Sequence, residues 1–185
     1  MSKQGRRNQR SDTFAALTRE KTRRGRPKSA TPRQSVYVAL SKAQKQRLSQ
    51  LAKQFPATLK RADIPDMCVM VLSTRMEQIR RAVAGRDREL PEGITDMESL
   101  YFLWDLPLPD MKAEAAWTSV RLSPLQVVEF GRLQGTFKAL FGATRSEVFM
   151  LAMTLLDDMT LIPQQNAYPY ATLDEYHTYL VNTYL

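Results

Sequence analysis

An internal repeat constrains the fold of this chain more than any other feature of its sequence. Residues 35–44 match residues 117–126, which lie 82 positions further along the chain. Each copy reads as a short strand that runs into a serine, Ser41 or Ser123, with a glutamine three residues later, a pattern typical of a capping box at the start of a helix. The fold must therefore contain the same strand-to-helix junction twice.

The same offset of 82 residues relates apolar positions in the helix that follows each junction. The related pairs are Leu48 with Phe130, Leu51 with Leu133 and Phe55 with Phe137. Spacings of three and four residues place each trio on one face of a helix. Each copy is therefore predicted to place a helix with one buried face directly after its strand.

A second helix is predicted in each copy. In the later copy, Gly142 ends the first helix, and Thr144 with Glu147 three residues on begins the next. The apolar residues of that helix recur on one face: Val148, Leu151, Ala152, Leu155, Leu156 and Met159. In the earlier copy Asp63 is the expected cap, and residues 67–72 are apolar all round, so we expect this second helix to be buried.

Each copy resembles the ribbon-helix-helix motif of the MetJ/Arc/CopG superfamily. The second copy carries the closer likeness, at the junction Ser-Val-Arg-Leu-Ser-Pro (119–124) and at the turn Gly-Ala-Thr-Arg-Ser-Glu (142–147). The first copy departs from the pattern, with Ala39 where a polar strand residue is usual and Asp-Ile-Pro-Asp in place of the glycine-containing turn. Two copies in one chain are a stronger signal than either motif alone.

The resemblance implies a mainly α fold with a two-stranded antiparallel β-ribbon, in which two ribbon-helix-helix repeats form an intramolecular pseudo-dimer. Physical reasoning favours the same arrangement, because a lone strand leaves its edges unpaired and a unit of about 45 residues cannot bury its own helices. The expected organisation is a disordered basic arm (1–33), repeat 1 (34–84), a linker (85–115), repeat 2 (116–160) and a tyrosine-rich C-terminal helix or tail (161–185).

Alternation along the two strands predicts which side chains face the helices. The inward set is Val36, Val38, Leu40, Thr118, Val120 and Leu122. The outward set, to which the resemblance assigns base readout in the DNA major groove, is Ser35, Tyr37, Ala39, Trp117, Ser119 and Arg121. Packing against a neighbouring segment is the alternative for Tyr37, and for Trp117 packing against the linker is the preferred expectation.

The two second helices suggest a further kind of DNA contact. The N–H groups at a helix N-terminus bind anions, and the resemblance implies that these two termini face the phosphates. The expected phosphate-binding residues are Asp63, Thr144, Arg145 and Ser146. The alternative for Asp63 and Thr144 is that they are helix caps alone.

The net charge of +8 is concentrated at the N-terminus. Residues 1–34 carry eleven Lys and Arg against two acidic residues, a net charge of +9, whereas the remaining 151 residues carry 16 basic and 17 acidic groups. Such a segment is predicted to be disordered until it binds a polyanion such as nucleic acid. Part of it resembles an AT-hook core, which implies minor-groove contacts by Arg23, Arg24, Gly25, Arg26, Pro27 and Lys28.

The composition argues against catalysis. One cysteine, Cys68, permits no internal disulfide and no thiolate-rich zinc site, and one histidine, His177, leaves little acid–base or metal chemistry. We therefore expect a protein that is not an enzyme and needs no cofactor and no metal. No apolar run approaches the roughly 20 residues of a membrane span. No secretory signal is recognisable, so the expected location is the cytoplasm, on the nucleoid when bound to DNA.

Our preferred interpretation is a sequence-specific transcriptional regulator, activator or repressor, whose partner is double-stranded DNA. The resemblance also fits an accessory protein at the transfer origin of a conjugative plasmid. A helical scaffold with a nucleic-acid-binding tail has the same composition but no reason to repeat strand, cap and helix. The tyrosines after Pro163 suit either packing or self-association into a dimer: Tyr168, Tyr170, Tyr176, Tyr179 and Tyr184.

Removal of residues 1–34 should flatten the salt dependence of DNA binding, because each lost phosphate contact changes the slope of log K against log salt by about 0.9. Preference for the core site should survive, since the arm supplies charge and flanking contacts only. Fluorescence anisotropy between low and moderate salt measures both quantities. A truncated chain that kept the full slope would show that the arm does not contact DNA.

Overall fold

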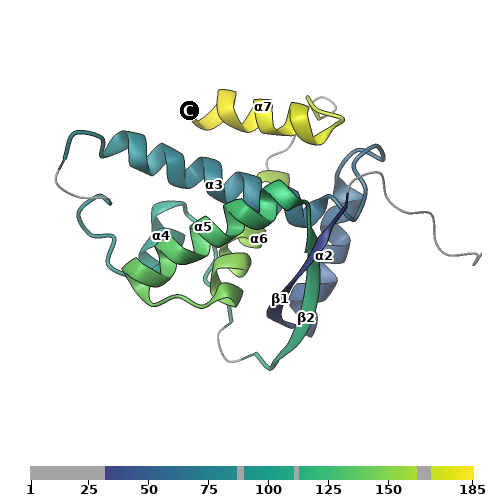
Figure 1. Ribbon diagram of the computed structural model, residues 1–185, viewed down its shortest axis with the longest axis horizontal. Helices are drawn as coiled ribbons and strands as arrows, with labels where there is room; N and C mark the ends of the chain where they lie inside the picture. Colours follow the sequence, from purple (N-terminus) through teal and green to yellow (C-terminus); the bar gives the residue numbers. More distant parts are fainter. Residues whose placement is uncertain (1–31, 87–89, 111–112, 162–167) are drawn as a thin grey trace, which may run out of the picture. The chain divides into compact units, whose positions relative to one another are not determined.

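The computed structural model describes residues 32–86, 90–110, 113–161 and 168–185. Within these residues the chain forms six helices and one two-stranded antiparallel sheet (Figure 1). The element order is β1 (Gln34–Ser41), α2 (Lys42–Gln54), α3 (Ile64–Ala82), α4 (Met97–Leu103), β2 (Ala115–Leu122), α5 (Pro124–Phe141), α6 (Arg145–Leu161) and α7 (Leu173–Tyr184). Strand, helix and helix thus occur twice, with α4 between the two copies and α7 after the second.

Strands β1 and β2, together called the ribbon, pair from Gln34 opposite Leu122 to Ser41 opposite Ala115. Tyr37 lies opposite Ser119, and these are the two residues that the repeat offset of 82 relates. A two-fold rotation exchanges each residue with its counterpart, so an axis relating two strands passes through such a pair. The register is therefore the one that two-fold-related copies adopt.

The alternation predicted for the ribbon is confirmed. Among the inward residues, Val38, Leu40, Val120 and Leu122 are buried and Val36 and Thr118 are half-buried. Among the outward residues, Ser35, Tyr37, Trp117, Ser119 and Arg121 are exposed and Ala39 is half-buried. One face of the ribbon therefore closes the core, and the other face meets solvent.

The helices of the two copies complete each other's core. Helix α3 of the first copy packs against α6 of the second, while α6 contacts β1 and α3 contacts β2. The predicted apolar stripe of α6 from Val148 to Met159 is buried, and so is the predicted run in α3 except for the half-buried Met70. Each copy therefore leaves apolar surface that the other copy covers.

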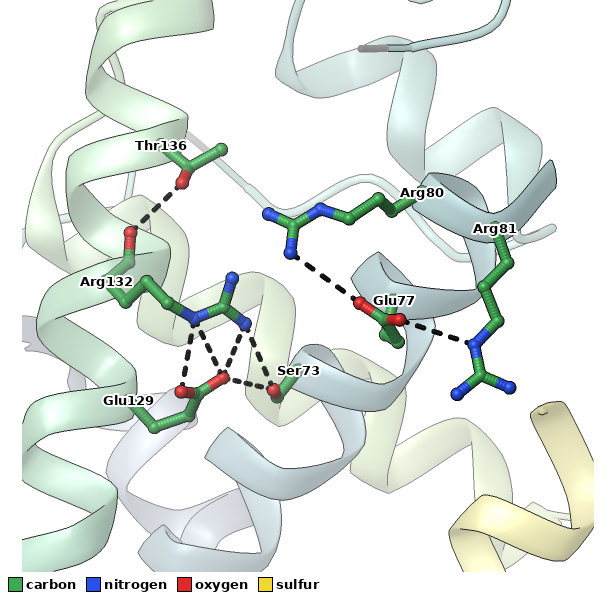
Figure 2. A network of polar contacts seen from close by, with 7 residues as sticks. All are labelled: Ser73, Glu77, Arg80, Arg81, Glu129, Arg132 and Thr136. Atoms are coloured by element: carbon green, nitrogen blue, oxygen red, sulfur yellow. Dashed lines mark hydrogen bonds and ion pairs between the residues drawn. The ribbon is translucent and has the colours of Figure 1, made fainter. Parts of the chain in front are cut away.

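A repeat-related pair of residues makes polar contacts between helices of the two copies, α2 with α6 and α5 with α3. In the first copy, Arg47 of α2 donates from Nε to the Asp157 carboxylate of α6 at 2.7 Å. Its counterpart in the second copy, Glu129 of α5, accepts from the Ser73 hydroxyl of α3 and pairs with Arg132 at 2.6 Å (Figure 2). The repeat-related position is an arginine in the first copy and a glutamate in the second, and each of them bonds to the second helix of the other copy.

The capping boxes agree with the sequence prediction at two helix starts and not at a third. At α2, the amide of Gln44 donates to the Ser41 hydroxyl, and the Gln44 side chain accepts from the Ser41 amide, as predicted. Thr144 and Glu147 form the predicted box at α6. The predicted Ser123 box at α5 is wrong. The Ser123 amide donates instead to Asp66, and the buried Oε1 of Gln126 has no partner among the described residues.

The predicted linker folds back on the core. Leu100, Tyr101 and Trp104 are buried, whereas Leu103 remains 47% exposed. The Arg75 guanidinium of α3 lies 5.3 Å from the Trp104 ring centroid and 4.7 Å from that of Tyr184, so it joins α4 and α7 to α3 by cation–π contacts. The linker is therefore part of the packed structure.

Of the two alternatives for the C-terminal segment, the structure shows a helix, α7, which begins after Thr172 with a capping box to Glu175. Helix α7 packs against α3 (Figure 1). It buries Tyr176 and Leu180. Tyr168, Tyr170, Tyr176 and Tyr179 form a chain of ring contacts that also includes Phe55. The packing role proposed for these tyrosines is thus confirmed, and self-association stays a prediction.

Candidate nucleic-acid interface

The outward face of the ribbon brings all six predicted base-readout residues together. Across the strands Ser35 lies opposite Arg121, Tyr37 opposite Ser119 and Ala39 opposite Trp117. The face presents a guanidinium and hydroxyl groups near one end and an indole with a methyl group towards the other. It therefore offers both hydrogen bonds and apolar contacts, the two kinds of interaction that distinguish base edges.

The two aromatic residues of this face project into solvent. Tyr37 is 60% exposed and Trp117 is 73% exposed. The preferred expectation that Trp117 packs against the linker is therefore wrong. Trp117 occupies an outward position of β2, whereas the buried linker residues Leu100 and Trp104 pack into the core behind the ribbon. Both rings remain accessible to a ligand that lies on the ribbon.

The first turn of α6 is fixed directly to the ribbon. The Ala39 amide of β1 donates to the Ser146 hydroxyl at 2.8 Å. The Ala39 N–H therefore points away from β2, because its hydrogen-bond acceptor lies outside the ribbon. Ser146, predicted to bind phosphate, thus positions the helix N-terminus beside the strand.

The other α6 residues of the predicted phosphate site have mixed electrostatics. Thr144 and Arg145 are exposed, and the Arg145 Nε donates to Gln134 at 3.2 Å. The Glu147 carboxylate accepts from both the amide and the hydroxyl of Thr144, at 2.6 and 2.7 Å. A phosphate at this terminus would lie near that negative charge, so Arg145 would have to offset it.

Asp63 does not have the capping role predicted for it. Its backbone is helical, with φ −87° and ψ −20°, and its side chain makes no bond to the first turn of α3. The carboxylate instead accepts from the Lys60 amide at 2.8 Å and from Arg33 at 2.5 Å. The Asp63 carboxylate is thus engaged in contacts within the chain. At this helix start, only the backbone remains available to a phosphate.

Arg33 is a structural residue that sequence reasoning assigned to the disordered arm. Its guanidinium also donates to Asp66 at 2.9 Å and to the Arg121 carbonyl at 3.3 Å, while Arg121 donates to the Arg33 carbonyl at 3.4 Å. Arg33 is therefore held beside the Ser35 and Arg121 end of the ribbon. The two acidic residues of Asp-Ile-Pro-Asp, at the start of α3, were the sequence signal that a cation could lie nearby.

Asp66 links Arg33 to the second copy. Its side chain is fully buried and accepts from the Ser123 amide at 2.9 Å. Burial raises the pKa of this carboxyl, while the bond from Ser123 and the charge of Arg33 oppose that rise. A single carboxylate thus joins Arg33, the start of α3 and the junction between β2 and α5.

Other predicted residues lie elsewhere. The minor-groove residues Arg23 to Lys28 fall outside the described part of the chain. Cys68 is buried, and burial raises the pKa of its thiol, while His177 is exposed on α7. Neither residue lies on the ribbon face.

Comparisons of the chain with protein-family models, curated proteins and solved structures find no match. Among the described residues, no group of three or more His, Cys, Asp and Glu is placed to hold a metal. No single helix in these residues is long and apolar enough to cross a membrane, and α5 with α6 meets that test only as a pair bent by 110°. The interface must therefore be interpreted from its own chemistry.

Two arginines at one end of the ribbon should differ sharply in their effect on stability. Arg33→Ala leaves the buried Asp66 carboxylate without its cation and should lower the free energy of unfolding by about 3 kcal/mol. Arg121→Ala removes an exposed side chain and should change it by less than about 0.5 kcal/mol. Urea unfolding followed by circular dichroism compares the two variants, and equal losses would contradict the structural role of Arg33.

Proposed function

We propose that this chain is a single-chain ribbon-helix-helix protein that regulates transcription by binding double-stranded DNA in a sequence-specific way. The observation that carries the proposal is the outward face of the ribbon, where five of six alternate residues are exposed while their inward neighbours close the core. An exposed, chemically varied ribbon face has no role in the packing of this chain. A ligand that binds along the ribbon would give this exposed face a role.

The shape of the ribbon favours the DNA major groove as that ligand. A two-stranded antiparallel ribbon fits a groove that is about 12 Å wide, and the side chains of one face then reach base edges. Arg121 has the chemistry to pair with guanine, and the Tyr37 and Trp117 rings and the Ala39 methyl suit contact with thymine methyl groups. Hydroxyls at Ser35 and Ser119 suit either base type.

The bound site should be asymmetric. The repeat relates Ser35 to Trp117, Tyr37 to Ser119 and Ala39 to Arg121, so the two halves of the ribbon face present different groups. A two-fold-symmetric protein reads a palindrome because its halves are identical. A pseudo-symmetric chain presents different side chains at equivalent positions, so its halves are not expected to read the same sequence.

Charge outside the ribbon supports the same proposal. Arg145 and the first turn of α6 are fixed beside β1 through Ser146, where a phosphate of a bound duplex would pass. Arg33 holds the base of the basic arm at the opposite end of β1. A scaffold whose tail alone binds nucleic acid would leave both the ribbon face and its supporting contacts unexplained.

Arg121→Ala should weaken binding to a site selected from a random duplex library by about 1 to 3 kcal/mol, the loss expected for one good base contact. Binding to random duplex should change little, because Arg121 is expected to contact a base rather than a phosphate. The loss for Tyr37→Ala should be smaller. Fluorescence anisotropy with both duplexes measures these differences.

Arg81→Ala is the matched control, because it removes an exposed arginine from the C-terminal end of α3. This variant should bind both duplexes like the native chain. If Arg121→Ala weakened selected and random duplexes equally, Arg121 would be a phosphate contact. If it weakened neither, the ribbon face would not be the DNA-binding surface.

A further inference from the structure

A cavity of about 450 Å³ lies between α4, the segment that follows it and the beginning of α6. Its walls come from residues 96–101 and 108–109, from the turn that joins α5 to α6 and from the first two turns of α6. No residue of the ribbon lines it. The volume lies within the range of small-molecule sites in proteins, which runs from about 300 to 1,000 Å³.

Apolar and aromatic side chains form part of the lining of this open cavity. Tyr101 is buried, while Met97, Phe141 and Met150 are half-buried and Leu108 is 48% exposed. Methionine side chains adapt to ligands of different shape, and aromatic rings attract cations to their faces. The interior therefore suits the hydrocarbon body of a small molecule.

The polar lining of the cavity has one sign of charge. Asp96, Glu98 and Glu147 line it, and no lysine or arginine does. The amide and hydroxyl of Thr144 donate to Oε2 of Glu147. The hydrogen bonds from Ser99 lower the pKa of Asp96. The cavity thus combines an apolar interior with negative charge.

We propose that this cavity binds an amphipathic organic cation, an amine or quaternary ammonium group carried on an aromatic or alkyl body. The apolar interior takes the body, and the carboxylates with the rings of Tyr101 and Phe141 take the charge. These two features are independent, since one concerns shape and burial and the other charge, and they select the same class of ligand. The proposal does not depend on DNA binding.

Isothermal titration calorimetry of the full chain tests this site with 4-phenylbutylamine as the probe. The amine is a cation at neutral pH, and 4-phenylbutanol and 4-phenylbutanoate offer the same body without charge and with negative charge. The amine should bind at least about tenfold more tightly than the alcohol, and the carboxylate most weakly. Methyl NMR should place the amine at Met97 and Met150.

Glu98→Gln removes one charge from an exposed residue of the lining and should weaken the amine about threefold to tenfold while leaving the alcohol unchanged. Leu108→Lys adds a positive charge at the rim and should weaken the amine more strongly. Glu114→Gln, an exposed carboxylate outside the cavity, is the matched control and should have no effect. Circular dichroism confirms that each variant is folded.

Three results would overturn the proposal. The alcohol could bind as tightly as the amine, or both lining variants could retain full affinity for the amine. The amine could also bind only after residues 1–31 are removed, which would make the basic arm, rather than a small molecule, the occupant of the cavity. Failure of DNA binding would leave these measurements unaffected, so the two proposals are tested separately.

Discussion

Pairing of β1 with β2 is the constraint on which the rest of the structure depends. A single strand exposes unpaired N–H and C=O groups along both edges, and the partner strand begins only after residue 114. Once these strands pair with Tyr37 opposite Ser119, the helices that follow them must leave from opposite ends of the ribbon. Helices α3 and α6 then meet behind it, and the core of each copy consists partly of the other copy.

The two copies share this geometry but differ in chemistry. At the first helix, Arg47 pairs with Asp157 of the other copy, whereas Glu129 accepts from the Ser73 hydroxyl of the other copy and pairs with Arg132 of its own helix. At the start of the second helix, Ser146 binds the backbone of β1 in one copy, whereas Asp66 and Arg33 bind the end of β2 in the other. The chain therefore repeats strand, helix and helix while its two copies present different side chains at each end of the ribbon. Such an arrangement is what the proposed binding to an asymmetric site requires.

Periodicity predicted the strands, their inward faces and most helices, because buried apolar residues recur at fixed spacings that a sequence displays directly. It could not predict the cluster of Arg33, Asp63 and Asp66, since these residues meet only after the chain has folded. The same limit explains the error at Ser123, where Asp66 from a distant helix takes the bond that Gln126 was expected to make. The Trp117 error arose because the sequence does not show where the linker packs. Base contacts, phosphate contacts and the arm stay predictions.

The most direct test of the account uses a disulfide across the ribbon. Because the Ala39 amide points away from β2, Ala39 and Trp117 form a non-hydrogen-bonded pair, whose Cα atoms are about 4.5 Å apart in such ladders and within disulfide reach. The full chain with Ala39→Cys and Trp117→Cys should oxidise to a closed monomer at every protein concentration, as intact mass and non-reducing electrophoresis will show. The single variants serve as controls. A covalent dimer that forms in place of the closed monomer would mean that the ribbon joins two chains, which contradicts the account.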